Sequence, residues 1–241
     1  MLALLYDIHG NLPALDAVLG DAHVAGADRF LLGGDYTLFG AWPLETIERL
    51  DALNADWLRG NGERWTADPA AAPSREPLRS ALAACREALP EATIARLGRL
   101  PVELTCDGTV FCHASPGSDV IGFKPGAAFD EGTRLAHLQA RRVVAGHTHV
   151  QFHRPSTIAG IELVNPGSVG LPLDGDRRAA YALLDDDDEV QLRRVEYDVD
   201  ASARAVRERF EPWAETVARR LERAELVLAP PSSPIPQIQE I

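Results

Sequence analysis

Four short clusters of residues along this chain carry side chains that commonly bind metal ions. The clusters are Asp7-Ile8-His9, Gly34-Asp35, Gly60-Asn61 and Gly146-His147-Thr148-His149, and a single His113 precedes the last of them. Carboxylate and imidazole groups together suit borderline divalent ions such as Mn, Fe or Zn. The clusters therefore have the composition of a ligand set for two metal ions, an arrangement suited to phosphoester hydrolysis.

Each cluster taken alone also has an ordinary structural explanation. The first could be a turn-stabilising carboxylate beside a surface histidine, and Asp35 and Asn61 could be turn residues. His113 ends an apolar segment, where a histidine is more often a hydrogen-bonded core residue. The glycine-led pair His147 and His149 is the strongest cluster, because two histidines so close together rarely fill a core. What favours metal binding is the occurrence of all the clusters in order, each at the end of a predicted strand.

The elements that must position these clusters alternate between apolar strand patterns and amphipathic helix patterns. Strands are predicted over 2–6, 30–32 and 57–58, and helices over 12–25 and 44–53. This β-α-β-α-β order predicts a sheet that begins parallel. Ligands of such sheets bind beyond the carboxyl ends of the strands, so Asp7, Asp35 and Asn61 should converge at one edge.

The rest of the chain is less regular. Residues 64–100 predict two helices, over 78–89 and 91–97, in a small cap-like insertion. Strands over 102–105 and 109–113 should form a hairpin around Asp107-Gly108, and a helix over 127–139 should lead to a strand over 142–145. Four later strand patterns, over 151–154, 161–165, 180–184 and 190–197, predict a second, more antiparallel sheet. Helices over 201–210 and 211–224 and a loose proline-rich tail over 229–241 complete the prediction.

Length and composition indicate one globular α/β domain. The chain has 241 residues, of which 46% are hydrophobic and 25% charged, and the clusters must meet in space. Its net charge of −12 argues against broad nucleic-acid binding, which needs a basic surface. A phosphate substrate would therefore need local positive charge, which bound metal would supply.

Location and redox state are expected from weaker signals. No charged leader precedes the short apolar start, and no stretch approaches the ~18 to 20 apolar residues of a membrane span, so a cytoplasmic protein without a membrane partner is expected. Cys85, Cys106 and Cys112 form no C-x-x-C pair and are expected to be reduced thiols. Cys112 adjoins His113, but neighbouring strand residues face opposite sides, so a core position is predicted for Cys112.

Together the clusters resemble the signature of the calcineurin-like metallophosphoesterase superfamily: D-x-H, G-D, G-N followed by H, D or E, a single H, and G-H-x-H. The match spans Asp7 to His149, and Asn165-Pro166-Gly167-Ser168-Val169-Gly170 with Asp174-Gly175-Asp176 is similar to the bacterial phosphodiesterase branch. The resemblance implies an α/β fold, a four-layer α/β/β/α sandwich of two mixed sheets flanked by helices with a small helical insertion. The metallophosphoesterase domain would span 1–228, with the insertion at 64–100.

The resemblance also implies a cofactor of two divalent metal ions, Mn, Fe, Zn or Ni, with Mn favoured. Asp7, His9 and His149 would hold the first ion; Asn61, His113 and His147 would hold the second, with Asp35 between them. A water or hydroxide bridging the ions would be the nucleophile. Asp35, Asn61 and His113 are the candidate catalytic residues within this set.

One position departs from the family pattern. Many members have a histidine after Gly-Asn that contacts the phosphate, but this chain has Gly62. Losing a general acid typically costs ~10² to 10⁴ in rate, so substrates with good leaving groups should suffer least. This favours a phosphodiesterase over a phosphomonoesterase or protein phosphatase. The adjacent Glu63 could orient a ligand or protonate a leaving group, but a solvated loop carboxylate is the commoner situation.

The partner implied is a small phosphoester or phosphoprotein substrate. The alternative is a non-catalytic scaffold of the same fold, as in the retromer subunit that resembles this family; the complete ligand set argues against it.

Lys124 could reach the substrate from a loop after His113. The segment 165–170 could shape the site or only turn the chain, and the acidic run 185–189 is expected to be a solvated turn. Three further histidines are predicted to be surface residues: His23, His137 and His153.

Overall fold

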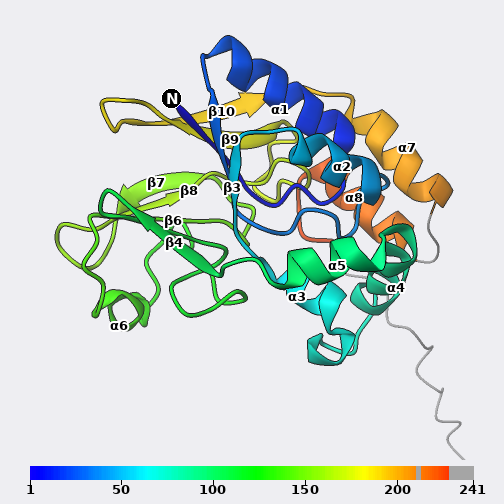
Figure 1. The fold of residues 1–241 in the computed structure, drawn as a ribbon, viewed down its shortest axis with the longest axis horizontal. Helices are drawn as coiled ribbons and strands as arrows, with labels where there is room; N and C mark the ends of the chain where they lie inside the picture. The colour runs from blue at the N-terminus through cyan, green and yellow to red at the C-terminus, as the bar shows by residue number, and fades with distance from the viewer. Residues whose placement is uncertain (210–212, 228–241) are drawn as a thin grey trace, which may run out of the picture.

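The first of two five-stranded sheets is built around the N-terminal strand. The computed structural model describes residues 1–209 and 213–227. The strand order of the first sheet is β10-β9-β1-β2-β3 (Figure 1). The strands β1, β2 and β3 are parallel to one another, as the alternation of strand and helix patterns predicts. β9 pairs antiparallel with both β1 and β10. The bounds are β1 Leu2–Leu5, β2 Arg29–Leu32, β3 Ala55–Trp57, β9 Ala179–Leu184 and β10 Val190–Val195.

The second sheet has the order β4-β5-β6-β8-β7. Its centre, β5, β6 and β8, is parallel, and its edge strands β4 and β7 are antiparallel to their neighbours. The turn between β4 and β5 is the predicted one, with positive φ at Asp107 (48°) and Gly108 (73°), the backbone of a tight hairpin turn. The bounds are β4 Glu103–Cys106, β5 Thr109–Cys112, β6 Arg142–Ala145, β7 Phe152–Pro155 and β8 Glu162–Asn165.

The predicted grouping of the four late strands into one antiparallel sheet is wrong. β7 and β8 extend the second sheet beside β6, whereas β9 and β10 add to the first sheet beside β1. Hydrophobic periodicity reports burial and not the identity of the pairing partner. The first five residues of β9 are all buried, which fits a strand enclosed between β1 and β10.

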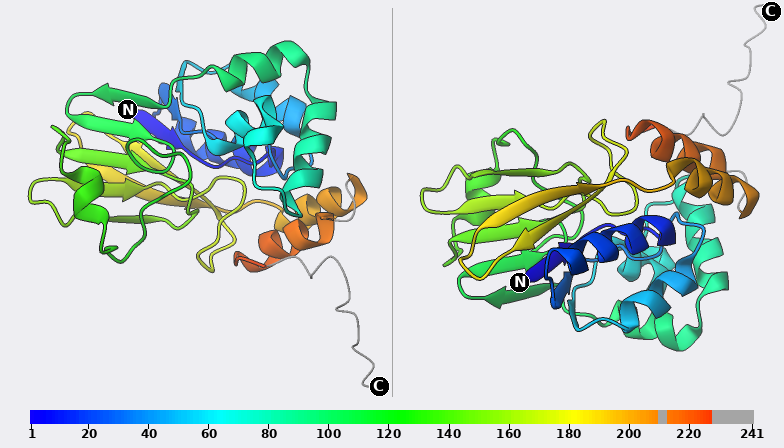
Figure 2. Two further views of the ribbon diagram at one scale, coloured as in Figure 1. Left: turned by 90° about the horizontal axis from the view of Figure 1, so that it is seen from below. Right: turned by 90° about the horizontal axis from the view of Figure 1, so that it is seen from above.

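The layers follow from the alternation of side chains along the strands. Leu4 and Phe111 point into the core between the two sheets. Leu5 points instead into the core under the helices of the first sheet. Val110 points to the outer face of the second sheet, where Leu135 of α6 covers it. Both mixed sheets are thus flanked by helices, as the four-layer sandwich requires, and α6 lies apart from the other helices (Figures 1 and 2).

Most helices agree with the sequence patterns. The observed bounds are α1 Leu12–Val24, α2 Pro43–Asp51, α3 Asn61–Ala67, α4 Leu78–Ala88, α5 Glu91–Gly98, α6 Glu131–Leu135, α7 Val199–Arg209 and α8 Ala214–Arg223, with a 3₁₀ turn at Pro69–Ala71. The predicted ends at 210–211 and the tail 229–241 lie outside the described residues. None of the helices in the described ranges is long and apolar enough to cross a membrane.

Two helices differ from the predictions. The helix predicted over 127–139 is only the short α6, because Phe129 is fully exposed and the segment therefore lacks a continuous apolar face. α3 was not predicted, and it begins at Asn61, inside one of the candidate ligand clusters. The helices α4 and α5 bury Leu82 and Leu97 in the same core as the helices of the first sheet. That residues 64–100 act as a cap stays a prediction.

Candidate metal centre

The structure brings all the predicted ligands together at one edge of the sandwich. Each lies beyond the carboxyl end of a strand that the sequence predicts, the first four after β1, β2 and β3 and the other three after β5 and β6. Backbone hydrogen bonds join these loops, for example Gly146 N to His113 O at 2.7 Å. The residues are Asp7, His9, Asp35, Asn61, His113, His147 and His149.

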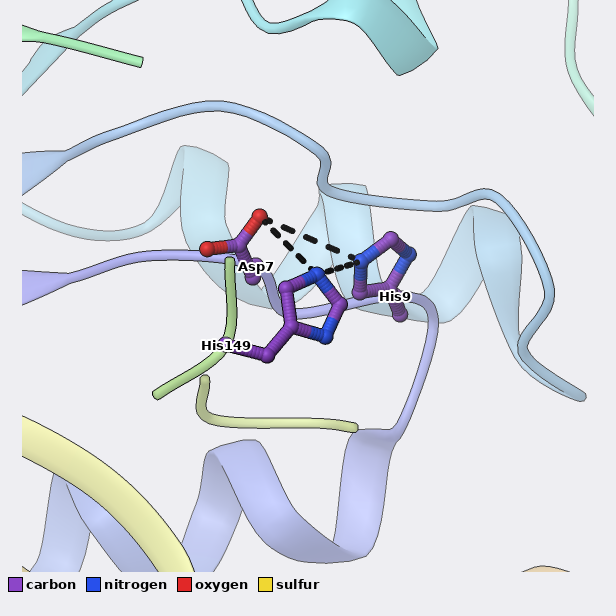
Figure 3. Close-up of side chains that lie close together, drawn as sticks. All are labelled: Asp7, His9 and His149. Atoms are coloured by element: carbon purple, nitrogen blue, oxygen red, sulfur yellow. Dashed lines mark hydrogen bonds and ion pairs between the residues drawn. The ribbon is translucent and has the colours of Figure 1, made fainter. Parts of the chain in front are cut away.

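Asp7, His9 and His149 form a first group whose side chains face one another (Figure 3). His149 Nε2 lies 3.4 Å and His9 Nε2 lies 4.0 Å from Asp7 Oδ1. The two Nε2 atoms are 3.1 Å apart. All three side chains are buried, so the three donor atoms surround one small volume.

Asp35 belongs to a second group, formed by Asp7, Asp35 and His113, and it also faces the first group. His113 Nε2 is 3.6 Å from Asp35 Oδ1 and 3.9 Å from Asp7 Oδ1. The other Asp35 oxygen, Oδ2, lies 3.9 Å from His9 Nε2. One carboxylate oxygen thus faces each group, the position that a bridging ligand would need.

Asn61 and His147 complete the second group. The Asn61 side-chain amide lies 3.0 Å from His113 Nε2, 2.9 Å from His147 Nδ1 and 2.9 Å from the Asp119 carbonyl oxygen. All three of these atoms can accept hydrogen bonds, and the two orientations of the amide, related by half a turn, present either its N–H₂ group or its oxygen to them. With the oxygen at this point, the amide would bind a hard cation.

Backbone carbonyls fix the tautomer of three histidine rings. The Nδ1 atoms of His9, His113 and His149 lie 2.6 to 2.8 Å from the carbonyl oxygens of Leu38, Gly33 and Leu171. A carbonyl only accepts, so in each ring Nδ1–H donates. The neutral ring then has its lone pair on Nε2, which faces the centre. This is the usual second contact of a metal-binding histidine.

The backbone of the site adopts an uncommon conformation. Nine residues other than glycine have a positive φ in the described part of the chain, and five of them are predicted ligands. The left-handed conformation costs roughly 1 to 2 kcal/mol per residue. Residues held in this way cluster at functional sites, where surrounding contacts enforce them. The five are Asp7 (54°), His9 (51°), Asp35 (57°), His147 (65°) and His149 (58°).

Glu63 holds the Asp35 loop in place, and the expectation of a solvated carboxylate is wrong. Its side chain is only 2% exposed, and its oxygens accept the backbone N–H groups of Asp35 (2.9 Å), Tyr36 (2.8 Å) and Gly60 (2.8 Å). The bond to Gly60 is the reach-back contact of a helix capping box. The spacing from Gly60 to Glu63 would have indicated this role had the start of α3 been predicted.

The segment 165–170 supports the ligand loops through hydrogen bonds. Ser168 Oγ donates to Asp7 O at 2.6 Å and accepts from Leu171 N at 2.8 Å. Leu171 in turn orients His149, so Ser168 links two predicted ligands of the first group. Asn165 Nδ2 donates to Gly146 O at 3.0 Å. These contacts assign the segment a supporting role.

Gly62 lies against Asp35. Its N–H donates to Asp35 Oδ1 at 2.6 Å. A Cβ atom at this position would lie 2.8 Å from the same oxygen and 3.2 Å from Asp35 Cγ. The site as observed therefore has no room for a side chain at residue 62 unless Asp35 moves.

Burial and mutual proximity shift the protonation of the site. Burial lowers the pKa of His9 to about 4, with repulsion from His149 adding to the effect. Burial alone would raise the pKa of Asp7, but the facing histidines, His149 first, hold it well below its usual range. Burial and the charge of Asp35 raise the pKa of Glu63 to about 7. An ionised Asp7 beside a neutral His9 is the state that binds a metal ion.

The donors present fit a divalent metal ion. Asp7 Oδ2 accepts the N–H of His147 at 2.8 Å. Asp7 Oδ1 is buried and has no hydrogen-bond partner in the described ranges. A buried, unpaired carboxylate oxygen is costly, and a cation would satisfy it. The mixture of carboxylate, imidazole and amide donors suits Mn, Fe, Zn or Ni better than the all-oxygen sites of Mg or Ca.

The remaining sequence predictions concern residues outside the centre. Cys112 is buried on the outer face of its sheet, as predicted, and Cys106 is exposed. The side chain of Lys124 is exposed and its carbonyl accepts from Arg154. The acidic run 185–189 is a turn between β9 and β10. The surface positions predicted for three histidines are confirmed: His23, His137 and His153 are exposed.

Comparisons with known proteins identify a family and a fold for the chain. Residues 1–189 match the calcineurin-like phosphoesterase superfamily domain. A protein of Methanocaldococcus jannaschii described as uncharacterised is 28% identical over 233 residues, covering 88% of this chain and 95% of the relative. The crystal structure of a metallophosphoesterase from Sphaerobacter thermophilus is similar with a TM-score of 0.79 and 26% identity, covering 92% and 98%. A hypothetical protein from Pyrococcus horikoshii has the same fold, with a TM-score of 0.77, 21% identity and coverage of 93% and 99%.

Proposed function

Because the chain belongs to the calcineurin-like phosphoesterase superfamily, we propose that it is a two-metal phosphoesterase that prefers phosphodiesters. The observation that carries the proposal is the position of the Asp35 carboxylate, which has one oxygen toward His9 and the other toward His113. The unpaired oxygen of Asp7 lies beside both groups. Two cation positions that share carboxylates are the arrangement that two-metal hydrolysis needs.

Each predicted ligand has a place in this proposal. Asp7, His9 and His149 would hold one ion; Asn61, His113 and His147 would hold the other, with Asp35 between them. When bound, the ions would supply Lewis-acid chemistry and lower the pKa of a coordinated water. Among Mn, Fe, Zn and Ni, we propose Mn as the bound metal.

The chain's own residues orient the ligands and set the charge of the site. The carbonyls of Leu38, Gly33 and Leu171 hold the imidazole lone pairs toward the centre. Glu63 and Ser168 fix the backbone of Asp35 and Asp7. Two divalent ions carry more charge than the two carboxylates that face them, so the loaded centre would attract a phosphate despite the net charge of −12.

The preference for diesters rests on Gly62. No imidazole follows Asn61 to protonate a leaving group, and the contact with Asp35 leaves no space for one. A monoester with a poor leaving group depends most on such an acid. A diester with a good leaving group is therefore the best substrate class for this site, and a small phosphoester in the cytoplasm is the proposed natural substrate.

A non-catalytic scaffold of the same fold is the competing proposal. A scaffold has no need for a complete ligand set or for the left-handed backbone at five of its members. Both features are present here, together with the hydrogen bonds that orient the rings. A catalytic site explains why the chain keeps these ligands and their strained backbone, and a scaffold does not.

The direct test is hydrolysis by metal-free protein reloaded with Mn(II). Bis-p-nitrophenyl phosphate should be cleaved faster than p-nitrophenyl phosphate, and chelation should abolish both activities. A matched control is Asp28→Asn, which removes an exposed carboxylate away from the site and should leave both rates unchanged. Failure to cleave either substrate with Mn, Fe, Zn or Ni would overturn the proposal.

A further inference from the structure

A pocket of about 300 Å³ adjoins the candidate metal centre and shares His113 with it. Arg59 and Arg64 line the pocket. They flank Asn61 in the chain, so the segment that supplies a predicted ligand also supplies two cations. The turn that follows His113 also lines the pocket, with Ser118 and Asp119. Any group attached to a phosphate held at the centre has this pocket as a neighbouring space.

The two arginines differ in how their charges are paired. Arg64 donates from Nε and Nη2 to the two oxygens of Asp119, at 2.6 and 2.7 Å. This bidentate pair uses both oxygens of the carboxylate. Arg59 has no ion pair in the described part of the chain, and its side chain donates from Nη1 to Gly98 O at 3.2 Å. Arg59 thus lines the pocket without a carboxylate bound directly to its guanidinium, although its charge also acts on the nearby Asp119.

Arg59 also has an unused donor. Its Nε is buried and lacks a hydrogen-bond partner among the residues described. A buried donor without an acceptor costs roughly 1 to 3 kcal/mol. A guanidinium group matches phosphate and carboxylate oxygens in geometry as well as charge. An anionic group in the pocket would pair with the charge of the Arg59 guanidinium.

We infer that this pocket is a second anion subsite, in which Arg59 recognises a phosphate or carboxylate group carried by a substituent of the phosphoester. The inference rests on the proposed function, since it places the reacting phosphate beside His113. The pocket volume is at the lower end for small-molecule sites, which are roughly 300 to 1,000 Å³. A small substituent fits this space better than a polymer does.

The rest of the lining is compatible with such a group. Glu103 lines the pocket but is exposed, so water screens its charge. Val102, which also lines the pocket, is 52% exposed and offers an apolar surface. The natural substrate class is then a phosphoester with two anionic groups, one reacting at the centre and one held by Arg59.

The test compares two dinucleotides that differ by one terminal phosphate, pApA and ApA. Calorimetry of the metal-free full-length protein should show pApA binding about tenfold more tightly, the effect of one charge-assisted hydrogen bond. Arg59→Gln should remove most of this difference, because it keeps a donor near Gly98 but loses the charge. Arg59→Lys should retain part of it. The control Arg223→Gln, on the exposed part of α8, should retain all of it.

Equal affinities for the two dinucleotides, or a preference that survives Arg59→Gln with normal thermal unfolding, would overturn the inference. The same proteins loaded with Mn(II) should show the preference in KM more than in kcat. Binding does not require turnover. Selective binding of pApA without hydrolysis of either compound would therefore support the subsite while contradicting the proposed function.

Discussion

The carboxylate of Glu63 accepts the backbone N–H of Asp35 at 2.9 Å. Through the same side chain it holds Gly60 and Tyr36, so a buried residue outside the predicted ligand set joins the loops after β2 and β3. Outer contacts of this kind set the position of the groups that bind metal, and their loss typically costs 10- to 100-fold in metal affinity, as an order of magnitude.

Replacing Glu63 by glutamine should therefore weaken Mn(II) binding by about tenfold or more. Glutamine has one acceptor oxygen instead of two, so at least one of the three N–H groups loses its partner. Isothermal titration with Mn(II) measures the effect. Glu87→Gln on the exposed part of α4 is the control. Equal affinities in all three proteins would show that Glu63 does not position Asp35.

The pH dependence of unfolding should also report on Glu63. Its native pKa of about 7 lies above the usual glutamate value of 4.5, so between these values the native state binds more protons than the unfolded state. Stability then falls as pH rises through this window. Denaturant unfolding of metal-free wild type and Glu63→Gln should show this contribution only in the wild type. If the free energy of unfolding of the wild type and of Glu63→Gln changed equally from pH 4.5 to 7, the raised pKa of Glu63 would be contradicted.

A side chain at residue 62 should disturb Asp35. The Cβ of Gly62→Ala would lie 2.8 Å from Asp35 Oδ1, and displacement of that carboxylate should lower metal affinity by about tenfold. Gly126→Ala, where no atom lies within 4 Å of the added Cβ, is the matched control. If Gly62→Ala binds two metal ions as tightly as wild type, Asp35 can move without loss of metal binding. The contact with Asp35 then does not explain why residue 62 is a glycine.

Removing the hydroxyl of Ser168 should affect both stability and one metal site. Ser168→Ala loses the bonds to Asp7 O and Leu171 N and should lower the free energy of unfolding by about 1 to 3 kcal/mol. Chemical denaturation of the metal-free protein measures this loss. Since Asp7 and His149 belong to the first group, the affinity of one of the two ions should fall more than that of the other. A stability change below the error of the method would contradict the supporting role.

The sequence predicts the centre better than it predicts the framework around it. Asp7, Asp35 and Asn61 follow strands whose parallel order is readable from local patterns, so their convergence could be anticipated. The pairing partners of β9 could not be anticipated, because its apolar residues indicate that the strand is buried but not which strands it pairs with. The carbonyls that orient the histidines and the role of Glu63 depend on long-range packing. They become visible only when the loops are placed together.

Metal content tests the central claim most directly. Wild-type protein equilibrated with Mn(II) and desalted should contain two ions per chain by elemental mass spectrometry, because two ligand groups share Asp35 and Asp7. Asp35→Asn should hold fewer ions and lose phosphodiesterase activity in proportion, while Asp28→Asn should match the wild type. Two tightly bound ions and unchanged turnover in Asp35→Asn would contradict a centre built around that carboxylate.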